Sequence, residues 1–456
     1  MKAFAHKNVV SYSVSSIKRN EPQFPFMNRS IQARLSAMMF LEFFVWGAWY
    51  TTVAVFMSAN GLEGLTHWPF TVNPIAALVA PFFVGLVADR YFSTQRVLGA
   101  LHLLGAAFMF VAPSVIGYPV IFILILLAYN LCFMPTMSLA NTLAFHNMTD
   151  QESQFPVIRV FGTVGWIVAG LSISYVGGLF FSPDVTVAST SFPLYLTAGA
   201  SALYGLYSFT LPHTPPPAKG EEVSVRDIVG IDALQKLGSP SFYVFLVSSF
   251  LISIPLAAYY NFTQVFLQST GFQEVAAVQT IGQASEVVFM LLMPLFFVRL
   301  GVKWMLGIGM LSWVVRYGLF AVGAPDVVTW MIIGGIALHG ICYDFFFVTG
   351  QIYVDKKASD DIRGQAQGLI ILLTYGAGML IGAQLAGWYF NFIRTGEQLS
   401  LEQWTTFWWA PAIFAGVVLV LFVFFFDDEV EVADESVASV MGASSDDEEE
   451  EEATAA

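Results

Sequence analysis

Long runs of apolar residues, separated by short breaks that contain polar residues, Pro or Gly, recur along most of the chain. A bilayer core about 30 Å thick is crossed by roughly 20 helical residues. Twelve runs reach about this length, at residues 33–57, 69–88, 97–115, 118–145, 156–178, 192–211, 241–268, 275–298, 304–323, 327–352, 364–390 and 404–426. The pattern predicts an all-α integral membrane protein with twelve transmembrane helices in a lipid bilayer.

One long interior connection, residues 212–240, divides these spans into two sets of six. The segments YNLCFMPTMSLAN, from Tyr129, and HGICYDFFFVTGQ, from His339, align at an offset of about 210 residues. Internal repeats of this kind are typical of transporter folds. We predict two pseudo-symmetric six-helix bundles, residues 33–211 and 241–426, flanked by an N-terminal extension at 1–32 and an acidic, disordered tail at 427–456.

Lys and Arg residues indicate orientation, because cytoplasmic loops carry an excess of them. If the spans alternate, sixteen fall on the side of the two termini: Lys2, Lys7, Lys18, Arg19, Arg29, Arg34, Arg90, Arg96, Lys219, Arg226, Lys236, Arg299, Lys303, Lys356, Lys357 and Arg363. Arg394 falls on the other side, and Arg159 and Arg316 lie within spans. The extension, the linker and the tail are therefore predicted to be cytoplasmic.

The composition excludes a soluble globular domain, because 56% of the 456 residues are hydrophobic and only 11% are charged. Thirteen of the 33 acidic residues lie in the tail, so the body is nearly neutral and nothing supports nucleic-acid binding. No phosphate-binding loop, HExxH, GxSxG or paired CxxC motif occurs. We therefore expect neither an enzyme nor a bound cofactor or metal. Cys132 and Cys342 lie in apolar stretches and are interpreted as buried hydrophobic residues.

Charged residues inside the predicted spans are the candidates for function, because a charge at the bilayer centre costs about 2.5 to 3.5 kcal/mol. They are Glu42, Arg159, Glu286, Arg316 and Asp344. Glu42 shares a helical face with Trp46 and Trp49, and a functional and a structural interpretation of it are equally open. Arg316 is interpreted as a structural partner for an acid.

Spans 5 and 8 place polar side chains on one helical face. Arg159, Thr163 and Trp166 stand at i, i+4 and i+7, a stripe that could bind a polar ring. Alternatively, Arg159 extends to the cytoplasm and Trp166 faces lipid. Gln283 and Glu286 stand at i and i+3, too deep for Glu286 to reach water. Glu286 therefore needs either a proton or an ion pair with one of the two intramembrane arginines.

Asp344 lies among phenylalanines in span 10, directly after Tyr343. A carboxyl group in these surroundings could take up and release a proton near neutral pH. Alternatively, Asp344 is a packing acid bonded to a neighbouring Tyr or Arg. His339 carries less weight, because a single His on an apolar face is usually a packing residue.

Several strings resemble a known family. GLVADRYFSTQR, between spans 2 and 3, resembles the loop signature of the major facilitator superfamily, with Gly85, Asp89, Arg90 and Arg96 at the matching positions. FLEFFVWGAWYTT, FPVIRVFGTVGW, GQASEVVFMLLMPLFFVRLGVKW, CYDFFF and RGQAQGL resemble the nucleoside:proton symporters of that superfamily. The resemblance runs from span 1 to span 12 and leaves out the extension and the tail.

The resemblance implies import of nucleosides by alternating access, driven by protons moving inward. It implies nucleoside contacts from Arg159, Thr163, Trp166, Gln283, Glu286 and Tyr343. Asp344 would be the proton-linked acid, with Glu286 and Glu42 as further acids of a coupled set. We expect a monomer in a plasma membrane, the inner membrane in a bacterium, with both termini cytoplasmic.

Two features differ from the family pattern. Glu42 stands where members have Gln, and span 7 places Ala257 and Tyr260 where a Gln and an Asn are expected. Asn261 and Gln264 lie nearby. The preference for purine or pyrimidine bases is therefore not predicted.

Two other functions are compatible with the sequence. The protein could be a symporter or facilitator for another small polar solute, such as a sugar or free nucleobase, which competition with unlabelled compounds would identify. It could also be a membrane receptor or scaffold whose acidic tail recruits partners. Deletion of residues 427–456 separates the last alternative, because a transporter should keep its uptake.

Overall fold

The computed structural model describes residues 28–83, 91–149, 151–216, 230–359 and 362–427. Across these ranges the chain is helical with short connections, and they contain no β-strand. An α-helix satisfies its backbone hydrogen bonds within one segment, as the bilayer core demands. The predicted all-α class is confirmed.

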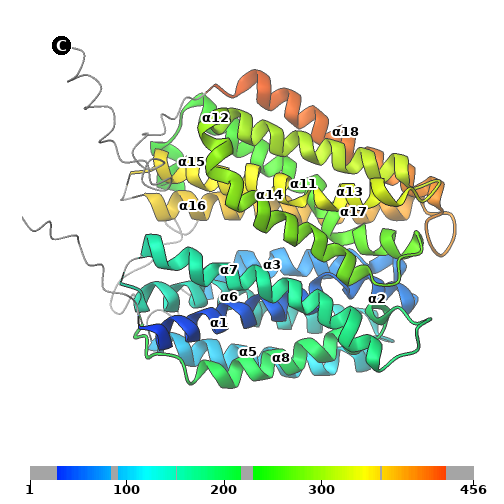
Figure 1. The fold of residues 1–456 in the computed structure, drawn as a ribbon, viewed down its shortest axis with the longest axis horizontal. Helices are drawn as coiled ribbons and strands as arrows, with labels where there is room; N and C mark the ends of the chain where they lie inside the picture. The colour runs from blue at the N-terminus through cyan, green and yellow to red at the C-terminus, as the bar shows by residue number, and fades with distance from the viewer. Residues whose placement is uncertain (1–27, 84–90, 150, 217–229, 360–361, 428–456) are drawn as a thin grey trace, which may run out of the picture.

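The helices fall into two consecutive sets (Figure 1). The first half contains α1 (Arg29–Tyr50), α2 (Val53–Ala59), η1 (Glu63–Leu65), α3 (Trp68–Phe83), α5 (Thr94–Val111), η3 (Ala112–Val115), α6 (Pro119–Asn147), α7 (Gln151–Leu171), the π-helix η4 (Ser172–Val176), η5 (Gly177–Leu179), η6 (Val187–Ser189) and α8 (Phe192–Ser208). After the short α10 (Ile231–Lys236), the second half contains α11 (Pro240–Ser269), α12 (Val275–Gly323), α13 (Thr329–Ala337), α14 (His339–Tyr343), the π-helix η7 (Asp344–Val348), α15 (Thr349–Lys357), α16 (Arg363–Ile371), the π-helix η8 (Leu372–Gly378), α17 (Met379–Ile393) and α18 (Leu401–Phe425).

These helices supply twelve spans. Nine helical segments in the described ranges are long and apolar enough to cross a membrane. Two further spans are α3, of which 16 residues are described up to Phe83, and α8, a helix of 17 residues. The twelfth arises within α12, whose 49 residues are interrupted at Gly301, with φ 65° and ψ 176°. Glycine adopts this backbone conformation without a side-chain clash, so the chain reverses there between spans 8 and 9.

Local sequence explains where two of the long helices begin. The Ser239 side chain accepts a hydrogen bond from the Phe242 amide, and Pro240 occupies the first turn of α11. Ser400 and Gln403 form a reciprocal capping box at the start of α18. Both helices then run through apolar sequence to the other side of the bundle.

Some predictions fall outside the described residues. Residues 1–27 of the predicted extension, 217–229 of the predicted linker and 428–456 of the predicted tail are among them, as are Gly85, Asp89 and Arg90 of the loop motif. Arg96 of that motif lies on α5 and is exposed. Helix α1 starts at Arg29, before the predicted boundary at residue 33, and α11 starts at Pro240.

The two halves lie side by side and contact each other at the end of the bundle that is remote from Phe425, the last residue of α18 (Figure 1). There the Gln384 amide donates to Thr71 Oγ1 at 2.7 Å, and the Asn391 amide donates to the Gly64 carbonyl at 2.9 Å. In addition, the Ala277 backbone N–H donates to the Ser174 hydroxyl at 3.1 Å. These contacts close one end of the space between the halves.

Gly340 allows α14 to approach α12 closely at the level of Glu286. A Cβ atom at Gly340 would lie 2.5 Å from the carbonyl carbon and oxygen of Ser285 and 2.6 Å from the Glu286 nitrogen. We therefore expect Gly340→Ala to lower the free energy of unfolding by about 1–3 kcal/mol, because backbone atoms must move to accommodate the methyl group. Thermal unfolding of the purified protein measures the change.

Gly307 provides the matched control on α12, because a Cβ atom there would meet nothing within 4 Å. Gly307→Ala should leave stability unchanged or raise it by about 0.4–1 kcal/mol. Equal unfolding temperatures for the two variants would show that the close approach at Gly340 has no energetic importance.

Candidate functional site

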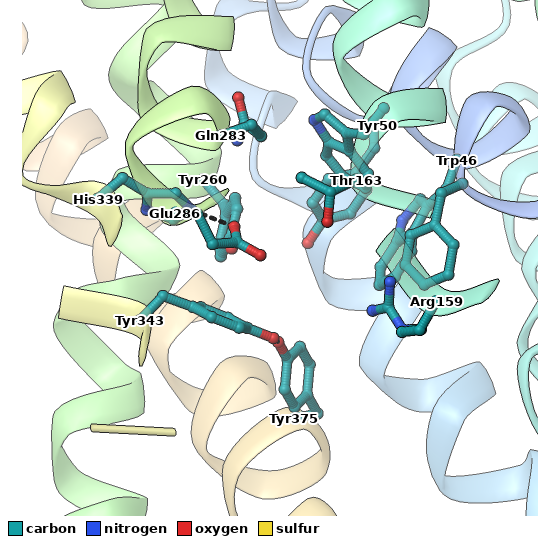
Figure 2. Close-up of a pocket in the computed structure, with 12 residues that line it drawn as sticks. Trp46, Tyr50, Arg159, Thr163, Tyr260, Gln283, Glu286, His339, Tyr343 and Tyr375 are labelled. Carbon is teal, nitrogen blue, oxygen red and sulfur yellow. Dashed lines mark hydrogen bonds and ion pairs between the residues drawn. The ribbon is translucent and has the colours of Figure 1, made fainter. Parts of the chain in front are cut away.

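A cavity lies between the two halves and is lined by both (Figure 2). The first half contributes residues from α1 and α7, and the second half contributes residues from α11, α12, α14 and η8. The lining residues are Phe43, Trp46, Tyr50, Arg159, Thr163, Trp166, Tyr260, Gln283, Glu286, His339, Tyr343 and Tyr375. All six residues that the resemblance implied as nucleoside contacts are in this set.

The wall formed by the first half combines one cation with aromatic rings. The Arg159 guanidinium carbon lies 4.1 Å from the centroid of the Phe43 ring, within cation–π range. The rings of Trp46 and Trp166 meet edge to face, with centroids 5.3 Å apart and planes at 71°. The alternative in which Arg159 extends to the cytoplasm and Trp166 faces lipid is wrong, because both side chains line the cavity.

Glu286 provides the acid on the opposite wall. Its carboxylate points into the space between the walls, facing the side that carries Arg159 and Thr163 (Figure 2). Glu286 Oε2 lies 3.9 Å from His339 Nε2, and the Glu286 side chain is 16% exposed. Of the two alternatives for Glu286, the ion pair with an intramembrane arginine is not formed within the described residues, where Glu286 contacts His339 instead.

Two tyrosines from different helices complete this wall. The hydroxyl groups of Tyr343 and Tyr375 lie 2.7 Å apart and share a hydrogen bond. Tyr375 belongs to the π-helix η8, and the π-helix η7 begins immediately after Tyr343. Such local widening of a helix is frequent at functional sites, since it turns side chains away from the regular helical positions.

Asp344 lies beside the cavity without lining it. The residue is fully buried, and neither carboxylate oxygen has a hydrogen-bond partner within the described part of the chain. Phe345, Phe346 and Phe347 follow it in the buried η7. As a packing acid, Asp344 would be bonded to a neighbouring Tyr or Arg, and within the described residues it is not. The adjacent Tyr343 bonds to Tyr375 instead.

Glu42 belongs to a separate buried network in the first half. Thr136 donates its hydroxyl hydrogen to Glu42 Oε1 at 2.7 Å, and His102 Nε2 lies 3.4 Å from Glu42 Oε2. The other ring nitrogen of His102 lies 3.1 Å from the Ser201 hydroxyl oxygen. Trp46, one turn along α1, lines the cavity, whereas Glu42 does not. The structure thus separates Glu42 from the other acids of the predicted set.

The expectation that Arg316 pairs with an acid is wrong. Its Nε–H donates to the Gly335 carbonyl at 2.9 Å, and its guanidinium carbon lies 4.1 Å from the Tyr259 ring centroid. The His339 ring also stacks on Tyr259, with centroids 5.4 Å apart and planes at 17°. Tyr259 therefore contacts both Arg316 and the cavity-lining His339.

Sequence reasoning missed several lining residues, above all His339, Tyr50 and Tyr375. His339 was given little weight because a lone histidine in an apolar run usually packs. The available signal was its position four residues before Tyr343, which places both on one helical face. For Tyr50 and Tyr375, the sequence around them offered no comparable polar pattern.

The arrangement suits a polar ligand with flat apolar faces. Aromatic rings on both walls can stack against such faces, while Arg159 donates hydrogen bonds and Glu286 accepts them. Across the described ranges, no group of three or more His, Cys, Asp or Glu side chains could hold a metal ion. Cys132 and Cys342 are free and buried, as the sequence indicated.

Comparison with known proteins gives consistent matches over most of the chain. The family model described as "Nucleoside H+ symporter" matches residues 29–431. The Escherichia coli (strain K12) protein named "Putative nucleoside transporter YegT" is 40% identical over 397 residues, covering 86% of this chain and 92% of the relative. The xanthosine permease of the same organism is 30% identical over 413 residues, covering 86% and 94%. A crystal structure of the nucleoside transporter NupG superposes with a TM-score of 0.77 at 28% identity, covering 88% of this chain and all of that one.

Proposed function

Because this chain belongs to the nucleoside H+ symporter family, we propose that it carries nucleosides across the membrane together with protons, by alternating access to the cavity between its halves. The observation that carries the proposal is the cavity itself. It brings Arg159, Thr163 and Trp166 of one half opposite Gln283, Glu286 and Tyr343 of the other.

The chemistry of the lining fits the two parts of a nucleoside. Trp46 and Trp166 offer ring faces on which a base can stack. Glu286 can accept hydrogen bonds from ribose hydroxyl groups, and Arg159 can donate to carbonyl or ring-nitrogen acceptors of the base. Because these groups come from both halves, a bound nucleoside would contact both halves and could shift the balance between their alternative arrangements.

Proton coupling is assigned to the two acids within the spans of the second half, the cavity-lining Glu286 and the buried Asp344. Glu286 contacts the nucleoside, and Asp344, one residue beyond Tyr343, holds the proton in surroundings without a competing partner among the described residues. Glu42 remains a candidate through its contact with His102. The charge distribution of the loops supports cytoplasmic termini and, with them, a cavity closed toward the outside in this structure. We place the protein in a plasma membrane, the inner membrane in a bacterium.

Uptake into proteoliposomes tests the proposal. The whole chain is purified in detergent as particles of monomer size and is reconstituted into vesicles. Labelled adenosine and uridine are then supplied with and without an inward proton gradient. Gradient-driven accumulation that a protonophore abolishes is the expected result. Uptake that the protonophore does not change would indicate a facilitator. Competition by a sugar or a free base, instead of by nucleosides, would indicate that another solute is carried.

A further inference from the structure

Four buried amide side chains lie on neighbouring turns of α11 and α12, toward the closed end of the bundle. Asn261 and Gln264 lie on α11, and Gln279 and Gln283 lie on α12; we refer to them as the amide cluster. Their relative exposures are 1%, 1%, 6% and 8% in that order, so all four are buried. Only Gln283 lines the cavity described above.

The amide cluster has unused hydrogen-bonding capacity. Gln264 Nε2 donates to Gln279 Oε1 at 2.5 Å and joins the two helices. Both polar atoms of Asn261, and the Oε1 atoms of Gln264 and Gln283, lack a hydrogen-bond partner within the described ranges. Buried polar groups are nearly always hydrogen-bonded in folded proteins. The amide cluster has four polar atoms that lack a hydrogen-bond partner, and it can therefore bind a polar ligand.

Gln264 and Gln279 lie one helical turn beyond the cavity lining. Gln264 follows Tyr260 by four residues on α11, and Gln279 precedes Gln283 by four residues on α12, so each shares a face with a lining residue. Next to this level, the rings of Tyr50 and Tyr260 meet across the two halves, with centroids 5.8 Å apart and planes at 61°. Both tyrosines belong to the cavity wall, and Tyr260 lies one helical turn from Gln264.

The contact that closes the bundle covers the amide cluster from the other side. The first two turns of α12 pack against α7 and η4: Gly170 faces Ala276 and Thr280, and Ser174 accepts the Ala277 N–H. Gln279 lies within the same stretch of α12. To open the bundle at this end, α7 must separate from α12. This separation would therefore uncover Gln279 and its partner Gln264.

We infer that the amide cluster is an outer binding position for the base of a nucleoside, occupied before the base passes Tyr50 and Tyr260 into the cavity. Amide groups donate and accept hydrogen bonds at once, which matches the mixed donor and acceptor edge of a nucleobase. The four members of the cluster carry no charge, so they suit a neutral ligand. This inference rests on the proposed function.

Methionine variants test the inference, because methionine keeps the length of glutamine without its amide. Uptake by Gln264→Met and Gln279→Met is measured for a nucleoside and for an analogue altered at the base edge. The pair is adenosine with purine riboside, or uridine with 3-methyluridine, according to which nucleoside the wild type accumulates. We expect the KM for the natural nucleoside to rise by roughly two- to tenfold at similar maximal rate. The analogue's KM should change little, so discrimination is lost.

Asn130→Leu provides the matched control. Asn130 accepts a hydrogen bond from Asn73 at 2.8 Å in the interior of the first half, away from the cavity. This variant removes a buried amide pair of the same kind, and we expect it to preserve base discrimination. Gln264→Asn retains the amide on a shorter side chain, so it serves as a control for misfolding of the methionine variant. It should shift the KM ratio in the same direction.

The possible outcomes separate the two proposals. Unchanged KM ratios in folded glutamine variants, beside a wild type that accumulates nucleosides, would overturn the outer position alone. An equal loss of discrimination in Asn130→Leu would also overturn it, because the effect would then be general destabilisation. A wild type that accumulates no nucleoside overturns the proposed function and this inference together.

Discussion

The Asp344→Asn variant is expected to lose gradient-driven accumulation of nucleosides while it still exchanges internal for external nucleoside. Asparagine has nearly the shape of a protonated aspartic acid but cannot release a proton. Asp344 is fully buried, and neither of its oxygens has a partner in the described part of the chain, so the substitution breaks no described hydrogen bond. We therefore expect the accumulation ratio to fall to about one, the value for an uncoupled carrier at equilibrium.

Counterflow and net uptake in the same vesicles measure the two activities separately. Asp355→Asn is the matched control, because Asp355 lies on α15, is 52% exposed and pairs with Arg363 at 3.3 Å. That variant should accumulate nucleosides as the wild type does. Full accumulation by Asp344→Asn would show that the coupling proton is held elsewhere, with Glu286 and Glu42 as the remaining acids of the predicted set.

The Glu286→Gln variant is expected to bind nucleosides far more weakly, in exchange as well as in net uptake. A hydrogen bond to a charged group contributes about 1.5–3 kcal/mol, which corresponds to roughly 10- to 150-fold in apparent affinity. Glu286 faces the cavity, and its ion-pair contact within the described part of the chain is with His339, so its carboxylate is available to a ligand. This loss in exchange distinguishes Glu286 from Asp344.

Concentration dependence of counterflow measures the apparent affinity. Glu274→Gln is the control on the same helix, since Glu274 is exposed at the start of α12 and lies outside the cavity lining. It should retain the wild-type affinity. If Glu286→Gln kept wild-type counterflow affinity and lost only accumulation, Glu286 would carry the proton without binding the nucleoside.

The cavity could be predicted in part because the membrane makes polar residues conspicuous. Arg159 with Thr163, and Gln283 with Glu286, each share a helical face, and a polar face inside a span needs a partner or a ligand. The polar face of each helix identifies residues on that helix, and these residues line the cavity. It does not identify which helices face each other, because the sequence pattern of one helix says nothing about its neighbour.

The aromatic and histidine lining could not be derived in this way. In a chain with 16% aromatic residues, Tyr50 and Tyr375 look the same as rings that pack in the interior. His339 gains its importance from Glu286, a residue more than fifty positions earlier on another helix. Only the packing of α14 on α12, at Gly340, brings the two together.

Glu42 is the opposite case, a residue that the sequence made a candidate but that does not line the cavity. Its position on span 1 left a functional and a structural interpretation equally open, and its helix does contribute Trp46 to the cavity. The side chain nevertheless turns into the first half, where His102 and Thr136 contact its two carboxylate oxygens. A single helix presents one face to the cavity and another to its own bundle, and the apolar sequence of α1 does not distinguish them.

The central claim is that one cavity couples nucleoside movement to proton movement, and simultaneous flux measurement tests it most directly. Nucleoside is added to proteoliposomes without any imposed gradient, while external pH and labelled nucleoside inside are followed together. The account predicts that entry of nucleoside makes the external medium more alkaline, and that Asp344→Asn abolishes the pH change. Entry of nucleoside at the wild-type rate with no proton movement would contradict it.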